Sequence, residues 1–543
     1  MKIKSLVVIL LTGLFLHTQG FAQSSWVVEL KGGATAQDLT NGWAKTSLRS
    51  NQISKVRLIA SHFNIYEVNT ATTYSKKQLL ENPAILYADP NVELEIRTTP
   101  NDPLINQEWH LNNISALKAW DQTTGGLTFN KDTLVLGVID FGVNIEHEDL
   151  KNRIWKNKGE IPGNNKDDDG NGYIDDVNGL SLRYLSERQS VDNNTDGLGN
   201  HGTSVAGLMG GESNNKIGIS GMMWNSKLMI ATFSANGNIA DLIEMMNYML
   251  DQRKRYNDSK GKEGALVVTI NYSGGISFAK AADYPIWCGM YDKMGAVGIL
   301  NCGATTNKYV DVDDEGDMPS TCPSEFLIAV TNTGQDNKRI YNAGFGLQHI
   351  DLGSPGEGVY STRSDNTNSY GAFSGTSAAT PIVAGAVGLM YSYPCKEWAD
   401  YLISHPVEAA RIVKKSLLAS VDKNADLTGK SVSGGRLNIA RALDTLKKYA
   451  CTSQITSIKN ELTIRSISPN PASNYINIQL DNNQSGEYKM TFYDIVGRKV
   501  AENNNLNISP AATIYLPVLS NGIYVLNLVG DAGIASRRIL IGQ

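Results

Sequence analysis

Several classes of protein are excluded by what this 543-residue sequence lacks. It contains no long run of lysine and arginine, and its formal net charge is -5, so a nucleic-acid partner is not expected. Beyond the first residues, no stretch reaches about 18 uninterrupted apolar residues, so no transmembrane segment is expected there. The five cysteines form no CxxC or Cys/His pattern, which argues against a zinc site.

The N-terminal residues have the pattern of a secretory signal peptide. MKIKSLVVILLTGLFLHTQGFAQ begins with Lys2 and Lys4, continues with a short apolar core, and ends in small residues around Ala22. We therefore assign residues 1–22 to a signal peptide that is cleaved after Ala22. The apolar core is too short for a membrane span, so a secreted or cell-surface protein without a transmembrane segment is expected after cleavage.

Export permits disulfide bonds, but the sequence leaves the pairing of the cysteines open. Five is an odd number, so at least one cysteine is expected to lack a partner within the chain. A bridge between Cys302 and Cys322 is the favoured hypothesis. The cysteines are Cys288, Cys302, Cys322, Cys395 and Cys451.

Three parts with different sequence patterns follow the signal peptide. Residues 23–98 combine strand-like WVVEL and FNIYEV with a short helical segment, which predicts a small α/β unit before the exposed linker TTPNDPLINQ. Residues 101–448 alternate buried strands such as ALVVTI with helices, which favours a parallel sheet covered on both faces. Residues 464–543 contain short strands between Asn, Gly, Pro and Ser turns, which predicts a small all-β sandwich.

Three stretches within residues 101–448 each carry one candidate catalytic residue. LVLGVIDFGV is a buried strand that ends at Asp140, and functional groups gather beyond the carboxyl ends of strands in open parallel sheets. GNHGTSVAGLMGG places His201 beside glycine. FSGTSAATPIVAGAVGLM places Ser377 at the start of a helix, where free N–H groups suit a negative oxygen. The small residues near Ser377, such as Ala378, are expected to leave room for a substrate.

In this order the three stretches resemble the signature motifs of the subtilases, the subtilisin-like serine peptidases, and subtilisin itself has the same Asp, His, Ser order. The resemblance covers residues 101–448 and implies a three-layer α/β/α domain with a mainly parallel sheet. It also implies a secreted serine endopeptidase that forms an acyl-enzyme. In that mechanism Ser377 attacks the scissile carbonyl, His201 transfers the proton, and Asp140 orients and stabilises the imidazolium.

The same resemblance implies a substrate cleft for proteins or peptides, with one departure from the family pattern. VVTINYSGG looks like the strand that lines the cleft through Ser273, Gly274 and Gly275. The family usually has Ala-Gly-Asn where an Asn side chain donates to the oxyanion, whereas GILNCGATTN has Ala304 at the position of that Asn. The remaining candidate donors are Asn301 and Asn307.

The stretch NKDDDGNGYIDDVNG has the spacing of a calcium loop. Asp167, Asp169, Asn171 and Asp175 offer oxygen ligands near alternate positions, with glycine for the sharp turn. The twelfth position is Asn178 rather than glutamate, which argues against an EF-hand. The loop is a candidate structural calcium site, and a solvated acidic turn is the alternative.

The flanking parts also resemble parts of exported peptidases. Residues 23–98 look like the inhibitory propeptide of subtilases, with processing expected near RTTPND; the alternative is a permanent N-terminal domain. SISPNPASNYINIQL, YDIVGRKV and LPVLSNGIYVLNLV resemble the sorting domain of type IX secretion cargo, which implies that machinery as a partner. The alternative is a generic binding sandwich.

The sequence therefore predicts a serine endopeptidase made as a zymogen. Two other functions are kept open: a non-catalytic binding protein with the subtilase fold, and a cell-surface adhesin built on the C-terminal sandwich. The departure at Ala304 is what favours the first of these. Cleavage specificity is not predicted, because loops that the sequence does not place build the pocket beside the catalytic serine.

Overall fold

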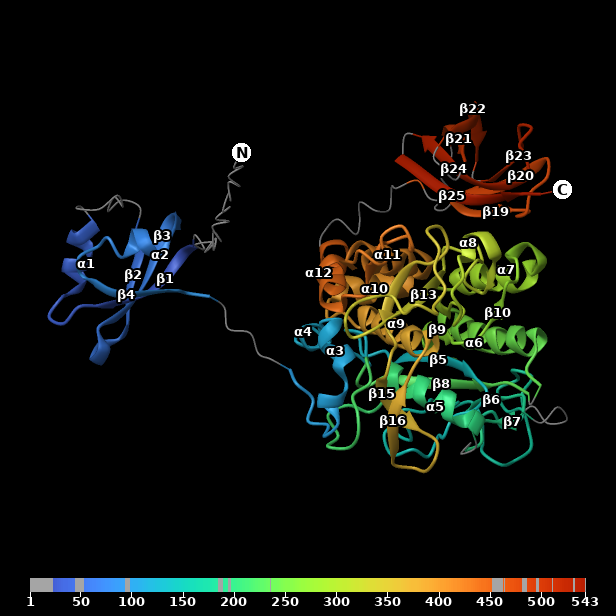
Figure 1. Cartoon of the computed structure of the whole chain (residues 1–543), viewed down its shortest axis with the longest axis horizontal. Helices are drawn as coiled ribbons and strands as arrows, with labels where there is room; N and C mark the ends of the chain where they lie inside the picture. The colour runs from blue at the N-terminus through green and yellow to red at the C-terminus, as the bar shows by residue number, and fades with distance from the viewer. Residues whose placement is uncertain are drawn as a thin grey trace, which may run out of the picture. The chain divides into compact units, whose positions relative to one another are not determined.

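The protein is described here by a computed structural model (Figure 1). It describes residues 23–43, 53–92, 98–183, 189–193, 197–234, 236–451, 462, 464–480, 486–494, 498–509, 511–530 and 533–542. The predicted signal peptide, residues 1–22, lies outside the described residues. The chain folds as two compact units, Met1–Ile96 and Arg97–Gln543.

The N-terminal unit is a four-stranded antiparallel sheet with two helices. The sheet has the order β2-β3-β1-β4, with β1 at Gln23–Leu30, β2 at Ile53–Ala60, β3 at Ile65–Tyr74 and β4 at Ile85–Pro90. Helices α1 (Ala36–Trp43) and α2 (Lys76–Leu79) pack Leu39, Trp43 and Leu79 into the same core as Trp26 and Val28. A capping box between Ser75 and Gln78 begins α2. The predicted small α/β unit is confirmed.

The second unit is built on a ten-stranded sheet, which is parallel from β6 through β18. Its order is β17-β18-β14-β13-β11-β9-β5-β8-β6-β7, and the two edge pairs, β6 with β7 and β17 with β18, are antiparallel. The strands are β5 (Leu134–Asp140), β6 (Gly179–Ser181), β7 (Gln189–Ser190), β8 (Lys227–Thr232), β9 (Leu266–Tyr272), β11 (Leu300–Ala304), β13 (Leu327–Thr333), β14 (Leu352–Pro355), β17 (Asp422–Lys423) and β18 (Gly435–Arg436).

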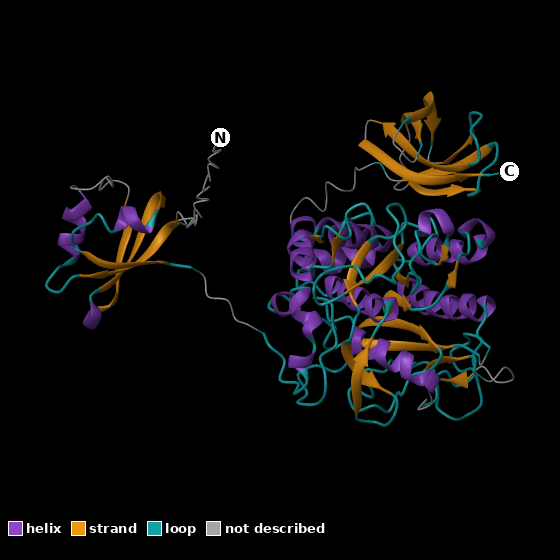
Figure 2. Ribbon diagram, in the orientation of Figure 1, coloured by secondary structure: helices purple, strands orange, loops and turns teal. Residues whose placement is uncertain are grey.

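Helices cover both faces of this sheet (Figure 2). Alternate residues of β5 point to opposite faces, so Leu136 and Val138 join one core while Val135 and Ile139 join the other. The first core contains α4 (Ala116–Trp120), α5 (Gly197–Gly210), α9 (Thr376–Tyr391), α10 (Lys396–Ser404), α11 (Pro406–Ala419) and α12 (Ile439–Ala450). The second contains α6 (Ile239–Ser259) and α7 (Pro285–Gly295). The predicted three-layer α/β/α domain with a mainly parallel sheet is confirmed.

The disulfide pairing differs from the favoured hypothesis. The bridges are Cys288–Cys322 and Cys395–Cys451, and Cys302 is free and buried. The proposed Cys302–Cys322 bridge is wrong because the two side chains belong to the cores on opposite faces of the sheet. The expectation that at least one cysteine lacks a partner is confirmed.

The C-terminal part is an all-β sandwich, as predicted. Its two sheets have the orders β19-β20-β23 and β22-β21-β24-β25. Ile476 and Ile514 of the first sheet share a core with Phe492, Leu526 and Ile539 of the second. The strands are β19 (Ile464–Ser468), β20 (Tyr475–Leu480), β21 (Gly486–Tyr493), β22 (Lys499–Ile508), β23 (Ala511–Tyr515), β24 (Gly522–Gly530) and β25 (Gly533–Ile541). In the described part of the chain, no helix has the length and apolar character needed to cross a membrane.

Candidate active site

Asp140 and His201 lie in direct contact. Every residue of β5 is buried, and its last residue, Asp140, is 3% exposed. Nδ1 of His201, on α5, lies 2.8 Å from Oδ2 of Asp140 and 3.0 Å from Oδ1. A Cβ at Gly202 would lie 2.9 Å from the Cβ of Asp140, so the glycine lets α5 approach the end of β5.

The environment of His201 prepares it to accept a proton at Nε2. Because Nδ1 is bonded to the carboxylate of Asp140, the neutral imidazole carries its proton there and presents Nε2 as the acceptor. Burial by itself would lower the pKa of His201, but the charge and hydrogen bond of Asp140 outweigh burial and raise that pKa above its usual value. The ring of Phe373 packs edge-on against the imidazole, 5.4 Å between centres.

Ser377 occupies the first turn of α9, which packs beside α5. Gly375 precedes the helix with φ of 122°, a conformation that favours glycine. The Ser377 hydroxyl donates to the carbonyl oxygen of Ser273 at 3.2 Å, and the Ser273 hydroxyl donates back to the Ser377 carbonyl at 3.1 Å. Within the described residues, the hydroxyl of Ser377 therefore points to the end of β9 and not to His201.

The small residues of α9 serve helix packing. Ala378 and Ala379 have no exposed surface, so they do not leave room for a substrate, which corrects the expectation for Ala378. A Cβ at Gly385 would lie 2.7 Å from the carbonyl oxygen of Met209 in α5. The run of alanine and glycine thus allows α9 to lie close to α5, and this brings the helices of Ser377 and His201 together.

A cavity of about 270 Å³ opens beside Ser377. The predicted cleft residues Ser273, Gly274 and Gly275 line it on one side, and Ala304 to Lys308 line it on another. A Cβ at Gly275 would overlap the carbonyl oxygen of Met318, so this wall requires glycine. The structure therefore brings Ser377 and the three predicted cleft residues to one pocket.

Asn307 is the asparagine that faces the start of α9. Its Oδ1 accepts hydrogen bonds from the backbone N–H of Thr376, at 2.9 Å, and from the Thr376 hydroxyl, at 3.1 Å. A backbone N–H requires an acceptor, so these bonds orient the amide and leave Nδ2 as a donor next to Gly375.

The other candidate donor, Asn301, faces away from this cavity. Asn301 is buried and donates its Nδ2 to the carbonyl oxygen of Phe326. Ala304 ends β11 and has no donor in its side chain. Thr305 and Thr306 separate the end of β11 from Asn307. Aligning the sequence on the Ala-Gly-Asn pattern therefore places Ala304, and not Asn307, at the position of the family's asparagine.

The acidic loop gathers a different set of carboxylates from the predicted one. Glu160, Asp169 and Asp176 each offer an oxygen, and these oxygens lie within 4.8 Å of one another. Asp176 also accepts hydrogen bonds from the Tyr248 hydroxyl and from Nδ2 of Asn157. Burial raises the pKa of Asp176, and the nearby charge of Asp169 raises it further. A cation here would relieve that repulsion.

Only one of the four candidate calcium ligands, Asp169, belongs to this group. Asp167 accepts the backbone N–H groups of Asn171 and Gly172, and Asp175 accepts those of Gly163 and Asn165. Asn171 donates its Nδ2 to Asp176. The prediction missed Asp176, although the Asp-Asp pair in GYIDDVNG contains it, and missed Glu160, which lies before the loop.

Comparison with known proteins gives two family matches. Residues 466–542 match the secretion system C-terminal sorting domain, so the sandwich is a sorting domain that marks the chain for export. Residues 131–433 match the subtilase family.

Two curated proteases are similar in sequence to part of this chain. Subtilisin-like protease 1 of Plasmodium vivax is 27% identical over 361 residues, which are 63% of this chain and 52% of that protein. An extracellular protease of Xanthomonas campestris pv. campestris is 27% identical over 327 residues, 56% of this chain and 53% of that protein. A solved protease structure from Pseudoalteromonas arctica is 21% identical, with a TM-score of 0.47, covering 64% of this chain and 100% of that one.

The chain spans about half the length of the curated relatives it matches. Since the family match at residues 131–433 covers more than half of the 543 residues and contains Asp140, His201 and Ser377, the chain belongs to the subtilase family.

Proposed function

We propose that the protein is a secreted serine endopeptidase that hydrolyses peptide bonds through Asp140, His201 and Ser377. The observation that carries the proposal is the hydrogen bond between Nδ1 of His201 and the buried carboxylate of Asp140, on a helix that packs beside the helix of Ser377. Catalytic hydrogen bonds are often loose in a free enzyme and tighten when substrate binds. The Ser377 hydroxyl would turn from the Ser273 carbonyl to Nε2 of His201 in that complex.

In the proposed reaction, Nε2 of His201 takes the proton of Ser377 as Oγ attacks the scissile carbonyl carbon. Asp140 stabilises the imidazolium without taking a proton. The imidazolium then protonates the leaving amine, and the acyl-enzyme is hydrolysed by water, which His201 deprotonates in turn.

Two donors are available to the negative oxygen that forms during the attack. Nδ2 of Asn307 is one of them. The backbone N–H of Ser377 is the other, because a residue in the first turn of a helix has no i-4 carbonyl within the helix to accept its hydrogen. The proposed role of Asn307 replaces the missing asparagine at Ala304, so the departure from the family pattern does not favour a non-catalytic protein.

A fluorophosphonate probe tests this function directly. The purified wild-type protein should be labelled and should hydrolyse peptides, whereas Ser377→Ala should do neither. Ser374→Ala is the matched control: this exposed serine lies three residues away and accepts the backbone N–H of Gly358, so labelling should persist. Absence of labelling and hydrolysis in the wild type would contradict the proposal and favour the binding-protein or adhesin functions.

We also propose that residues 23–98 act as an inhibitory propeptide and that type IX secretion machinery recognises the sorting domain. The N-terminal unit is compact by itself, and the stretch expected to be cleaved, RTTPND, begins at the first residue of the second unit. Residues 93–97 lie outside the described residues. N-terminal sequencing of the secreted protein should find a start within this stretch. A mature chain that still begins near residue 23 would support a permanent domain instead.

We further propose that the group Glu160, Asp169 and Asp176 holds a structural calcium ion. Hard carboxylate oxygens are the ligands Ca²⁺ takes, and the group braces the loop that follows β5. A chelator should therefore lower the melting temperature of the wild type. Asp169→Asn should remove that difference, and Asp192→Asn, at an exposed position, should preserve it. A chelator effect that persists in Asp169→Asn would place the ion elsewhere.

A further inference from the structure

The cavity beside Ser377 contains a carboxylate that the proposed reaction does not use. We propose that Asp317 makes the enzyme selective for lysine or arginine at the residue immediately before the scissile bond. This inference rests on the proposed peptidase function and adds the substrate class. The other residues that line this pocket include Ser273, Gly275 and Lys308.

Asp317 lines the pocket, and one of its two carboxylate oxygens is held by hydrogen bonds. It belongs to the short strand β12 (Asp317–Met318), which pairs with β10 (Ile276–Ser277), and it is 2% exposed. Oδ2 accepts hydrogen bonds from the Thr305 hydroxyl at 3.0 Å, the Thr306 backbone N–H at 3.1 Å and the Ser320 hydroxyl. In the described part of the chain, no hydrogen bond reaches Oδ1. A charged group entering the pocket therefore finds an oriented acceptor.

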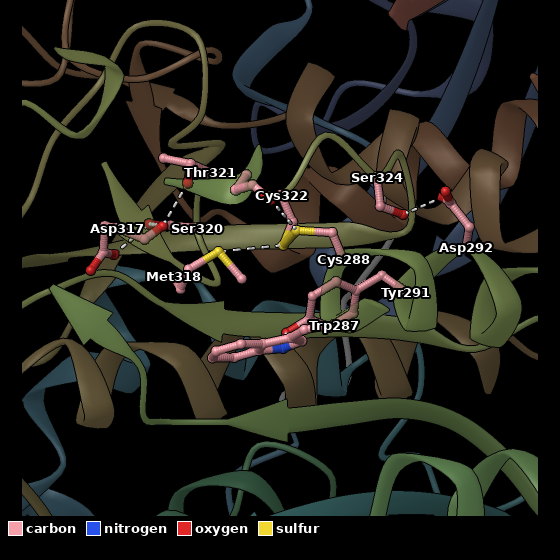
Figure 3. The surroundings of a disulfide bond; sticks show 11 residues. Trp287, Cys288, Tyr291, Asp292, Asp317, Met318, Ser320, Thr321, Cys322 and Ser324 are labelled. Atoms are coloured by element: carbon pink, nitrogen blue, oxygen red, sulfur yellow. Dashed lines mark hydrogen bonds between the residues drawn. A yellow bond between two sulfur atoms is a disulfide. The ribbon is translucent and has the colours of Figure 1, made fainter. Parts of the chain in front are cut away.

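Hydrogen bonds and a disulfide hold the turn that carries Asp317 (Figure 3). Both the backbone N–H and the hydroxyl of Thr321 donate to the Asp317 carbonyl oxygen, at 3.0 and 2.8 Å. The next residue, Cys322, forms the disulfide with Cys288 of α7, and its sulfur lies 3.8 Å from that of Met318. These contacts hold the carboxylate at the wall of the pocket, which is the preorganisation that a selective site needs.

Charge and size favour a long cationic side chain. The volume of about 270 Å³ is several times the ~30 Å³ share of one liquid water molecule, so a whole side chain fits. Burial raises the pKa of Asp317 to about 6, and the hydrogen bonds from Ser320, Thr305 and Thr306 limit the increase. The carboxylate is therefore largely ionised at neutral pH. A buried charge without a partner is costly, and a lysine or arginine side chain supplies the partner.

Lys308 is the other charged residue of the pocket and offers a rival explanation. It is exposed, and its ammonium lies 4.7 Å from the centre of the Phe278 ring. It forms no ion pair with Asp317 among the described residues, although its charge lowers the pKa of that carboxyl. If Lys308 dominated recognition, the enzyme would instead prefer glutamate before the scissile bond.

Four peptides that differ only in the residue before the scissile bond test the proposal. That residue is lysine, arginine, norleucine or glutamate, and norleucine has nearly the length of lysine without its charge. The wild type should show the highest kcat/KM for lysine or arginine. Asp317→Asn should lower the ratio of lysine to norleucine about 30-fold or more, because removing one partner of a buried charge pair is costly. Asp314→Asn, which removes an exposed charge three residues away, should keep the wild-type ratio.

A second measurement needs no variant. Benzamidine, a small planar cation, should compete with the lysine peptide and slow labelling of the wild type by the fluorophosphonate probe. A wild-type preference for norleucine or glutamate, or an unchanged ratio in Asp317→Asn, would overturn the proposal. A glutamate preference that disappears in Lys308→Met would assign specificity to Lys308. If the wild type cleaves none of the four peptides and is not labelled, the peptidase function itself fails.

Discussion

Replacing Asn307 with alanine removes the side-chain donor proposed for the oxyanion. The structure predicts that turnover should fall by about 10²–10³, the loss known for subtilisin, the namesake of this family, when its oxyanion donor is removed. The peptide concentration that gives half-maximal rate should change little, because this hydrogen bond strengthens only as negative charge develops in the transition state. The decrease in kcat is therefore the diagnostic quantity.

The same substitution also affects folding, and this effect must be measured separately. Oδ1 of Asn307 accepts two hydrogen bonds from Thr376, whose backbone begins α9 and which is 1% exposed. Leaving a buried donor without an acceptor costs about 1–3 kcal/mol. The urea concentration at the unfolding midpoint of Asn307→Ala should decrease accordingly. Active-site titration then gives the concentration of active enzyme by which turnover is divided.

Asn307→Asp separates the two effects. An aspartate keeps an oxygen that accepts from Thr376, so most of the stability should return. It lacks the Nδ2 donor and places negative charge near the developing oxyanion, so turnover should stay at or below that of Asn307→Ala. If either variant turns over peptide within about threefold of the wild type, measured per titrated site, Asn307 is not the donor and the reasoning is refuted.

Three further predictions concern His201, Arg97 and the Cys288–Cys322 disulfide. Activity on the norleucine peptide should decrease as pH falls, because His201 must be neutral to accept a proton. Since Asp140 raises the pKa of His201, the pH of half-maximal activity should lie above the usual 6.5 of histidine. A flat activity profile from pH 8 to pH 5 would contradict the role of His201 as the base. If the enzyme processes itself at the basic residue of RTTPND, Arg97→Gln should delay processing and N-terminal sequencing should find Thr98 in the wild type, whereas unchanged processing would assign the cut to another bond or enzyme. Replacing Cys288 and Cys322 together with serine, in an inactive background, should lower the unfolding free energy by about 3–4.7 kcal/mol, since the bridge joins residues 34 apart; an unchanged denaturation midpoint would argue against this pairing.

The layers of the fold were predictable because they depend on local patterns. LVLGVI is apolar on both alternating sets of residues, and a strand buried on both faces needs this. Leu136 and Val138 do pack on one face, with Val135 and Ile139 on the other. The short strands and polar turns of residues 464–543 likewise predicted the sandwich, since alternation and turn chemistry are read within about ten residues.

The surroundings of the candidate site were less predictable, because they depend on how loops return to the sheet. The Ala-Gly-Asn pattern placed Ala304 at the position of the family's asparagine. In the structure, the turn after β11 instead brings Asn307 into contact with the start of α9. The Cys302–Cys322 hypothesis failed because spacing along the chain does not tell which face of β11 the cysteine occupies. The role of Ala378 was misjudged for a similar reason: a small residue suits both an open cleft and a close helix contact.

By itself, the sequence determined the layer arrangement, the sorting domain and the three candidate catalytic residues, since each is marked by a short stretch whose meaning is local. Only the tertiary structure decided that Asn307 contacts the start of α9, which acids gather around Asp169, and that Asp317 lines the pocket beside Ser377. These relations join residues that turns and helix packing bring together across the sheet. Their distances are set by the packed fold and are not encoded in any one stretch of the chain.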